Sequence, residues 1–418
     1  MKNLSFAVLG LRNFRLLLIT RFCIGMALQA QAIIVGWQVY SLTHNPFLLG
    51  LTGLTEAVPA ILCALVSGHI VDTNHPRWIY LGCLTALLVN TTALFLMGGG
   101  ILTEVGPHQI PWIFTGVFIS GVARSFIMPS SFSLLPRIVE RKDFPSASAW
   151  LSSGVQIAMI AGPALAGLLY GGYGPRVAWM LPMFMVTMAL TMMLILRTPP
   201  IERGQARALT MWESIREGWA FILSKPVLLS VMSLDMFAVL FGGAVAMLPA
   251  YADQVLHVGS EGLGLLRASP AIGAVTMALI LAVRPMQVIS AKRLMFAVAG
   301  FGCCMIGFGL SKIFLLSVFF LMLGGVFDSI SVVVRGTLMQ ILTPDNVRGR
   351  VSAVNSMFII SSNEIGSFES GTAASLLGLV PSVVFGGFAS LAVVATVAWL
   401  SPQFRRTVVQ THEEAKAG

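Results

Sequence analysis

Nine charged side chains stand inside long apolar stretches of this sequence, where a bilayer would surround them. A charge at the centre of a bilayer costs at least about 2.5–3.5 kcal/mol, so such residues are usually paired and often functional. Arginines and carboxylates are nearly balanced among them. They could form ion pairs, bind a charged solute, or load and release protons. The nine are Arg21, Glu56, Arg124, Asp235, Arg267, Asp328, Arg335, Glu364 and Glu369.

The positions of these charges follow an internal repeat. Moving the chain back by 204 residues places residues 366–371 on residues 162–167, and a shift of 211 aligns Pro270 with Pro59. Equivalent positions then carry opposite charges: Arg124 and Asp328, Glu56 and Arg267, and, less closely, Arg21 and Asp235. We hypothesise ion pairs across the interface of two halves, formed in one conformation and broken in another. Local pairing within one half, for stability alone, is the alternative.

Four of the carboxylates are candidates for carrying a proton. A carboxyl group in apolar surroundings can titrate near neutral pH, where it loads and releases a proton. Asp235 and Asp328 rank first, because the first, fourth, seventh and tenth spans should line a central cavity. Glu364 and Glu369 lie in an unusually polar stretch of the eleventh span. A structural, hydrogen-bonding role is an equal alternative for these two.

The elements that must hold these charges are membrane helices. The chain is 56% hydrophobic and 10% charged, whereas a soluble domain has roughly 25% charged residues. Because a helix needs about 20 apolar residues to span a bilayer, the pattern predicts twelve spans, and we expect no cleavable signal peptide. The spans cover residues 14–41, 46–70, 77–99, 110–132, 146–171, 175–197, 227–252, 261–283, 291–311, 314–337, 350–378 and 381–400.

The sequence therefore predicts an all-α membrane protein with twelve transmembrane helices in two pseudo-symmetric six-helix bundles. Parallel repeats of this kind are related by an axis along the membrane normal, with a site between them near the midplane. The expected N-terminal bundle covers residues 1–197 and the C-terminal bundle residues 227–418, joined by a cytoplasmic linker at 198–226.

The linker is expected to contain an amphipathic helix that lies on the membrane surface and tethers the bundles. Thr210 and Glu213 form a capping box at its start. A role of this helix in substrate binding is less favoured. Its apolar face carries Trp212, Ile215, Trp219 and Ile222.

The net charge of +9 is a signal of topology and does not indicate nucleic-acid binding. Nearly all lysines and arginines outside the spans fall on one side, if both termini are cytoplasmic. Only Arg176 and Lys312 fall on the other side. This positive-inside bias predicts the orientation.

Small residues recur every four positions on the fifth span and on its repeat partner, the eleventh. They let two helices approach closely in lipid, where packing drives association. This face could be a static contact, or a surface on which the halves slide during transport. The small residues are Gly154, Ala158, Gly162 and Ala166 on the fifth span, and Ser362, Gly366 and Ser370 on the eleventh.

Two motifs resemble those of the major facilitator superfamily. Residues 68–77 are similar to Gly-x-x-x-Asp-Arg-x-Gly-Arg-Arg, and residues 162–167 to the exporter motif Gly-Pro-x-x-Gly-Gly, with alanine for one glycine. The resemblance implies that the retained residues act in conformational gating. They are Gly68, Asp72 and Arg77 in the first motif, and Gly162, Pro163 and Gly167 in the second.

Further runs resemble the subgroup of this superfamily that includes the enterobactin exporter and macrolide efflux pumps. They are residues 13–15, 21–22, 121–124, 134–139, 343–344 and 348–351. The resemblance implies proton-driven transport, more often outward, of a drug-like compound or siderophore across a bacterial inner membrane. Import of a siderophore or organic anion is the alternative, since Arg21 and Arg124 could bind an anion.

Other classes of function fit poorly. The sequence has no Walker-type nucleotide motif, no nucleophile turn and no helical histidine pair for a metal, and no repeated channel filter. We therefore expect no enzyme activity, no cofactor, no metal and no nucleic acid. The expected partners are a small-molecule substrate, protons and membrane lipids, and the chain should act as a monomer. A transporter-like sensor or lipid-handling factor is the remaining alternative.

Overall fold

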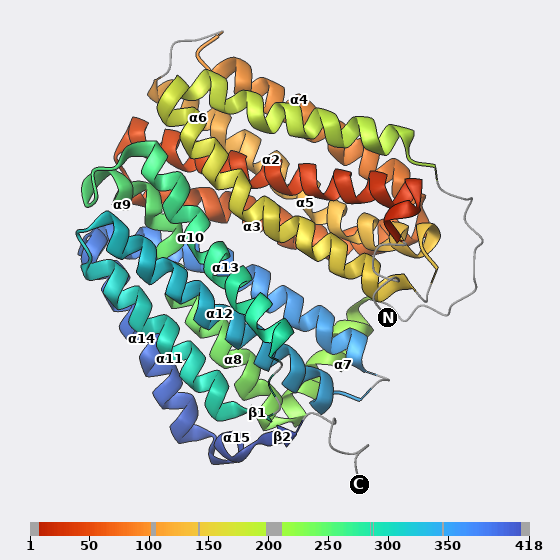
Figure 1. Ribbon diagram of the computed structural model, residues 1–418, viewed down its shortest axis with the longest axis vertical. Coiled ribbons are helices and arrows are strands. Elements are labelled where there is room, and N and C mark those ends of the chain that lie inside the picture. Colours follow the sequence, from red (N-terminus) through yellow and green to blue (C-terminus); the bar gives the residue numbers. More distant parts are fainter. Residues whose placement is uncertain are drawn as a thin grey trace. The chain divides into compact units, whose positions relative to one another are not determined.

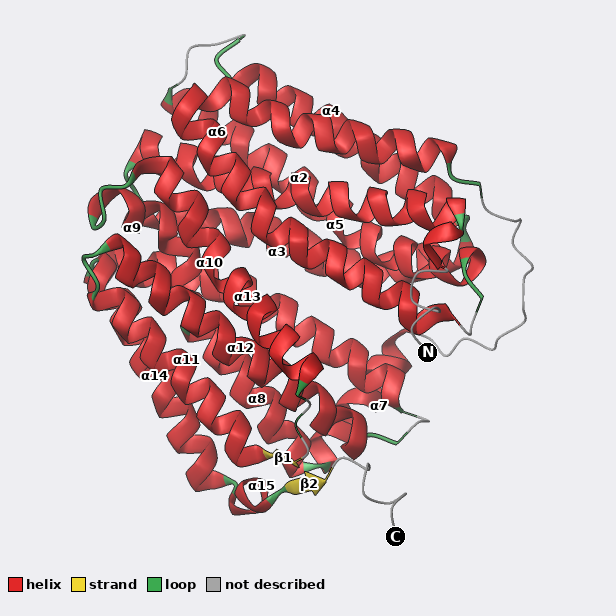
Figure 2. Cartoon of the chain, viewed as in Figure 1, coloured by secondary structure: helices red, strands yellow, loops and turns green. Residues whose placement is uncertain are grey.

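The computed structural model describes residues 8–101, 106–140, 143–197, 211–284, 286, 288–344 and 347–410. Nearly all of this part of the chain is helical (Figures 1 and 2). The first half contains η1 (Val8–Gly10), α2 (Arg12–Thr43), α3 (Pro46–Thr73), α4 (Pro76–Gly98), η2 (Pro107–Gln109), α5 (Ile110–Ile138) and α6 (Phe144–Ile195).

The second half has the same helical character, with one short antiparallel ribbon formed by β1 and β2. Its elements are α7 (Met211–Ser224), α8 (Pro226–Phe241), η4 (Gly243–Met247), α9 (Leu248–Gln254), α10 (Gly259–Val283), β1 (Val288–Ser290), α11 (Ala291–Leu310), α12 (Phe314–Leu342), α13 (Arg348–Leu377), α14 (Leu379–Leu400), α15 (Pro402–Arg406) and β2 (Val408–Gln410).

Local sequence explains where several helices begin. Pro46, Pro76 and Pro226 occupy the first turn of their helices, where a missing backbone N–H costs nothing. The Asn45 side chain accepts a hydrogen bond of 2.9 Å from the N–H of Phe47 and so caps α3. Capping of this kind contributes about 1 kcal/mol to a helix.

α6 contains a sharp break at Gly174. Its φ of 78° and ψ of −179° are readily adopted only by glycine, and Pro175 follows without a donor N–H. The break separates the two spans predicted at 146–171 and 175–197, which lie in one continuous helical element. Gly378, with φ of 92°, makes the corresponding break between α13 and α14.

All twelve predicted spans are found as helices, which confirms the predicted fold class. The span predicted at 227–252 is divided into α8, η4 and α9. Within the described residues, ten helical segments are long and apolar enough to cross a membrane, and Ser146–Ile195 holds two predicted spans. α13 is not among the ten, because it carries the polar stretch that contains Ser367 and Glu369.

The chain divides into two compact units. The first comprises Met1–Leu48, Leu54–Arg207 and Val258–Ala268, and the second comprises Leu49–Gly53, Ala208–His257 and Ser269–Gly418.

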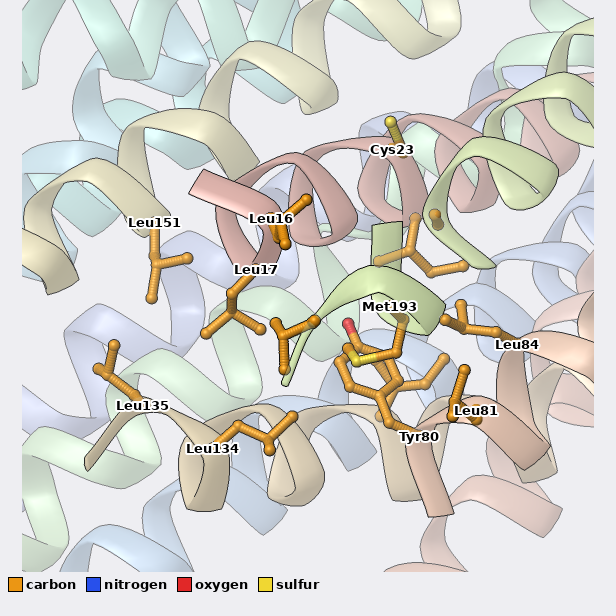
Figure 3. Packing of buried hydrophobic residues seen from close by; sticks show 14 of the residues in the cluster. Leu16, Leu17, Cys23, Tyr80, Leu81, Leu84, Leu134, Leu135, Leu151 and Met193 are labelled. Atoms are coloured by element: carbon orange, nitrogen blue, oxygen red, sulfur yellow. The ribbon is translucent and has the colours of Figure 1, made fainter. Parts of the chain in front are cut away.

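The interior of the first unit is a cluster of leucines and larger apolar side chains from α2, α4, α5 and α6 (Figure 3). Leu17, Tyr80, Leu84, Leu134 and Met193 are all fully buried there. In lipid such contacts act through close packing, since lipid tails are as apolar as leucine. The stability of this cluster therefore depends on how well the side chains fit together, and their packing holds α2 against α4, α5 and α6.

The second unit has its own buried cluster, to which α7 contributes. Ile222 on α7 is fully buried. The centre of the Trp219 ring lies 5.1 Å from the centre of the Phe358 ring of α13. A helix thus lies where one was expected within the linker 198–226, and it packs against the second unit. Its place on the membrane surface and its role as a tether stay predictions. Thr210 and the side chains of residues 211–215 lie outside the described residues, so the capping box stays a prediction.

Candidate functional site

An ion pair joins α3 and α5 in the first unit. Arg124 Nη1 donates to Glu56 Oε1 at 2.8 Å, and the two side chains are 51% and 24% exposed. Gly121, one turn before Arg124, makes this pairing possible. A Cβ there would collide with the backbone oxygen of Glu56 and lie 2.9 Å from Pro59 Cγ. The pair is therefore held by close backbone packing, yet both side chains remain partly exposed.

Arg21 on α2 contacts α5 at Ser131 and Phe132, which lie further along α5 than Arg124. Its Nη1 donates to Ser131 Oγ at 2.8 Å, and its guanidinium lies 5.8 Å from the centre of the Phe132 ring. Within the described residues, Arg21 has no carboxylate partner. Its positive charge is thus oriented by neutral groups, which leaves it able to attract an anion.

A neutral polar network lies between α2, α4 and α5. Gln31 Nε2 donates to Ser120 Oγ at 2.8 Å, and Asn90 Nδ2 donates to Ser120 Oγ and to the Gly116 carbonyl, both at 3.0 Å. Asn90 and Ser120 are not among the site residues predicted from the sequence. An amide inside an apolar span is a signal that could have found Asn90, because such groups hydrogen-bond between helices in lipid.

The second unit contains a different ion pair, between Asp235 on α8 and Arg335 on α12. Both side chains are only 8% exposed. α8 and α12 supply the apolar neighbours Leu234, Ala238 and Val334, which are also buried. The charges therefore satisfy one another in an enclosed setting, unlike the pair in the first unit.

These two pairs are of the local kind, within one half, that the sequence left as the alternative for three of the charged residues. Pairing across the interface in another conformation stays a prediction. The repeat suggested Arg267 for Glu56, Asp328 for Arg124 and Arg21 for Asp235. In this structure, each of Glu56, Arg124 and Asp235 pairs with a residue of its own unit. The physical reason is proximity within a bundle: neighbouring helices already supply the counter-charge that lowers the cost of burial.

The remaining candidates are scattered along three helices. Asp328 on α12 is partly buried and has no hydrogen bond or ion pair among the described residues. Glu369 on α13 is partly buried and accepts a long hydrogen bond of 3.5 Å from Ser370 Oγ. Arg267 on α10 is also partly buried, and the side chain of Glu364 lies outside the described residues.

The first gating motif is described only in part, since the burial of Gly68 and the side chain of Asp72, both on α3, are not described. Arg77, at the start of α4, donates from Nη2 to the Leu194 carbonyl of α6 at 2.9 Å. Its guanidinium also lies 5.4 Å from the Trp78 ring centre. Arg77 therefore links the start of α4 to the end of α6, where helix carbonyls attract a cation.

His75 lies beside this arginine, just before α4. Partial burial, then the charge of Arg137 and then that of Arg77 lower the pKa of His75 below its usual value. Its Nδ1 is buried without a hydrogen-bond partner, as is Nη1 of Arg137. Three basic side chains thus crowd one end of the unit, and the imidazole is the one that gives up its proton.

The second motif packs α6 tightly against α2. A Cβ at Gly162 would lie 2.9 Å from Gln29 Cβ and 3.2 Å from the Met26 carbonyl. Pro163 is buried beside it. Gly167 faces the first turns of α10 within the same unit, where its Cβ would come within 2.7 Å of Gly264 Cα.

The repeat partner of Gly162 has the equivalent contact in the second unit. A Cβ at Gly366 on α13 would lie 2.7 Å from the Leu240 carbonyl of α8. α6 with α2 and α13 with α8 are therefore related by the shift of 204 residues seen in the sequence. Gly162 and Gly366 are thus close-packing positions, and a sliding role of this face stays a prediction.

Metal chemistry has no support in the part of the chain that is described, where no three His, Cys, Asp or Glu side chains gather as metal ligands would. The arrangement instead offers charged and polar side chains on membrane helices. Such groups bind and release solutes or protons without covalent chemistry.

The family model of the Major Facilitator Superfamily matches residues 17–367 of the chain. The enterobactin exporter EntS of Citrobacter koseri is 23% identical over 393 residues, which cover 94% of this chain and 92% of that protein. The Escherichia coli protein of the same name is 22% identical over the same shares of both chains.

Solved transporter structures share the fold. A bacterial homologue of the iron transporter ferroportin, inward-facing, has a TM-score of 0.70 and 17% identity, covering 95% of this chain and 99% of that chain. A bacterial homologue of the lysosomal transporter Spinster, inward-facing and occupied, has a TM-score of 0.71 and 14% identity, covering 94% and 97%. At these identities the likeness concerns the fold alone.

Proposed function

Because the chain belongs to the major facilitator superfamily, and is therefore a multi-pass transporter of small molecules and not an enzyme, we propose that it is a proton-coupled exporter. The solute is a drug-like compound or a siderophore, carried by alternating access across a bacterial inner membrane. Both termini are cytoplasmic, and the functional unit is a monomer. Relatives named enterobactin exporter, which align over 94% of this chain, support export.

The observation that carries the proposal is the ion pair Glu56–Arg124. Both side chains are accessible, so a solute or a proton can reach the pair from outside the unit. A proton on Glu56 removes the charge that holds Arg124. A partly exposed pair of this kind, with a hydrogen bond of 2.8 Å, can open and close at a small cost in free energy.

Asp328 is the second group in the proposed proton path. It lies at a partly buried position on α12 without a counter-ion among the described residues. Asp235 differs from Asp328, because it is buried and its charge is balanced by Arg335. We therefore assign proton transfer to Glu56 and Asp328, with Glu369 as a further member, and a structural role to Asp235.

The alternative is import of a siderophore or organic anion, and Arg21 favours it. An anionic solute could bind Arg21 and Arg124 while a proton neutralises Glu56, so the solute and the proton would bind together. In export by antiport, they would bind in alternation. The direction in which binding responds to pH therefore separates the two functions.

A cellular experiment identifies the solute and the direction. The chain is expressed in a bacterial strain that lacks its main efflux pump, and growth is measured on a panel of toxic compounds, with siderophore measured in the medium. Export predicts higher tolerance to at least one compound, or more siderophore outside the cells. Greater sensitivity, or uptake of labelled siderophore, would establish the import alternative.

A reconstituted experiment tests the coupling. Purified protein in liposomes, loaded with the compound found in cells, should move it faster when a pH gradient is imposed. The Asp328→Asn variant should lose this response, while Asp253→Asn, a partly exposed carboxylate on α9, should keep it. An unchanged response in Asp328→Asn and Glu56→Gln would remove both residues from the proton path.

A further inference from the structure

A pocket of about 480 Å³ opens at one end of the second unit, where α10 ends and α11 begins. It is separate from both ion pairs and is lined by residues of α10, β1, α11 and α12. Figure 1 shows β1 and β2 beside the start of α11. This end of the helices is cytoplasmic in the proposed orientation.

Two arginines form the charged part of this pocket. Arg293 donates one N–H to the Val288 carbonyl, which leaves most of its five donors unused. Arg284, just after α10, has no side-chain hydrogen bond or ion pair in the described part of the chain. Among the residues that the structure describes, no carboxylate lines the pocket. The two guanidinium groups therefore present uncompensated positive charge to one space.

The rest of the lining is apolar and faces outward. Phe296 on α11 is 68% exposed. The other apolar residues of the wall are Met277, Leu281, Met286, Val288 and Ile330. A soluble anion would leave this surface uncovered. A ligand that matches the pocket needs a negative headgroup for the arginines and a hydrocarbon chain for the wall.

We propose that this pocket binds an anionic phospholipid, with Arg284 and Arg293 on the headgroup phosphate and Phe296 and Leu281 beside an acyl chain. Arginine forms strong paired hydrogen bonds with phosphate oxygens. Basic residues where a helix leaves the membrane attract anionic lipids, each by a factor of about five in affinity. The bound lipid would join α10 to α11 at this end of the unit.

The C-terminal residues 411–418 are the competing occupant. They follow Gln410, which pairs with Val288 of the pocket, and they include Glu413 and Glu414. Their sequence, Thr-His-Glu-Glu-Ala-Lys-Ala-Gly, has no large apolar side chain to cover Phe296. The apolar wall therefore favours lipid over this segment.

Native mass spectrometry of the purified full chain tests the proposal. Phosphatidylglycerol and phosphatidylcholine with identical acyl chains are titrated separately, and glycerol phosphate tests the headgroup without the chain. We expect tighter binding of the first phosphatidylglycerol than of phosphatidylcholine, and no binding of glycerol phosphate at the same concentrations. Equal binding of the two lipids, or binding of glycerol phosphate, would overturn the proposal.

Matched variants locate the bound lipid. Arg284→Gln with Arg293→Gln should weaken phosphatidylglycerol binding roughly 30-fold, and Arg284→Gln alone about fivefold. Lys292→Gln with Arg406→Gln removes the same charge from exposed residues outside the pocket. Equal losses in the two double variants would mean general attraction to the basic surface and would reject the site.

Two further variants separate the occupants. Phe296→Ala keeps the charges and should weaken binding of the lipid. The ring is largely exposed and packs edge-on against Phe327, so only a small loss of thermal stability is expected. A chain that ends at Gln410 should bind phosphatidylglycerol as the full chain does. If lipid binds only after that truncation, the C-terminal segment is the true occupant and the proposal is wrong.

Discussion

The ion pairs Glu56–Arg124 and Asp235–Arg335 join the same chemical groups in different surroundings. The first has side chains 24% and 51% exposed, whereas both side chains of the second are 8% exposed. Accessible pairs contribute about 0–1 kcal/mol to stability. Removing one partner of a buried pair costs about 3–5 kcal/mol, because the other charge is left without compensation.

Because their exposure differs, the two ion pairs are suited to different roles although both join a carboxylate and a guanidinium group. The accessible pair can exchange its partner for a proton or a solute, since little stability depends on it. The buried pair resists exchange and holds α8 to α12. Burial, and not the type of residue, therefore separates a group suited to transport from one suited to support.

The largest expected effect comes from breaking the buried pair. Arg335→Gln should lower the free energy of unfolding by about 3–5 kcal/mol, because Asp235 then remains charged and enclosed. Unfolding of the purified protein in detergent, followed by tryptophan fluorescence, measures this. The exposed Arg405→Gln on α15 is the control. Adding Asp235→Asn to Arg335→Gln should restore part of the loss, and no restoration would contradict the pairing.

A smaller loss should follow from separating α3 and α5. Gly121→Ala places a methyl group against the Glu56 carbonyl and Pro59, and overpacking of this kind costs about 1–3 kcal/mol. Gly82→Ala on α4 is the matched control, because nothing lies within 4 Å of a Cβ there. The control should be neutral or stabilising, as alanine favours helix. Equal effects of the two changes would refute close packing at Gly121.

Opening the accessible pair should barely change stability. Glu56→Gln should shift the free energy of unfolding by less than about 1 kcal/mol, while the pH response of transport in liposomes is lost. The stability measurement is the same fluorescence assay, so the result compares directly with Arg335→Gln. A loss as large as that of Arg335→Gln would erase the distinction between the two pairs.

The smallest effect concerns His75, outside the spans. Its pKa is lowered by partial burial, and then by the charges of Arg137 and Arg77. The folded protein thus binds a proton at His75 less readily than the unfolded chain, so stability falls as the pH drops below about 6.5. Arg137→Gln should raise the pKa of His75, measured by NMR of isotope-labelled histidine. His75→Gln identifies the signal, and an unchanged pKa would exclude the influence of Arg137.

The sequence by itself determined the spans, the repeat and the class of fold. Apolar runs long enough to cross a bilayer have few alternatives to helix, because every backbone group must be satisfied internally. The repeat also identified Gly162 and Gly366 as close contacts, since a duplicated bundle reuses the same packing. The gap predicted between the spans 146–171 and 175–197 contains the break at Gly174. These features depend on local sequence and its periodicity.

Only the tertiary structure decided which charges meet. The repeat matched Glu56 with Arg267 by position, yet the side chain of Arg124 lies 2.8 Å away on a neighbouring helix. Ion pairing depends on the rotation and separation of helices, which Gly121 sets for α3 and α5. The spacing of residues in the sequence predicts which side chains share one face of a helix. It does not predict which neighbouring helix that face contacts. Exposure, which separates the two ion pairs, likewise exists only after the helices have packed.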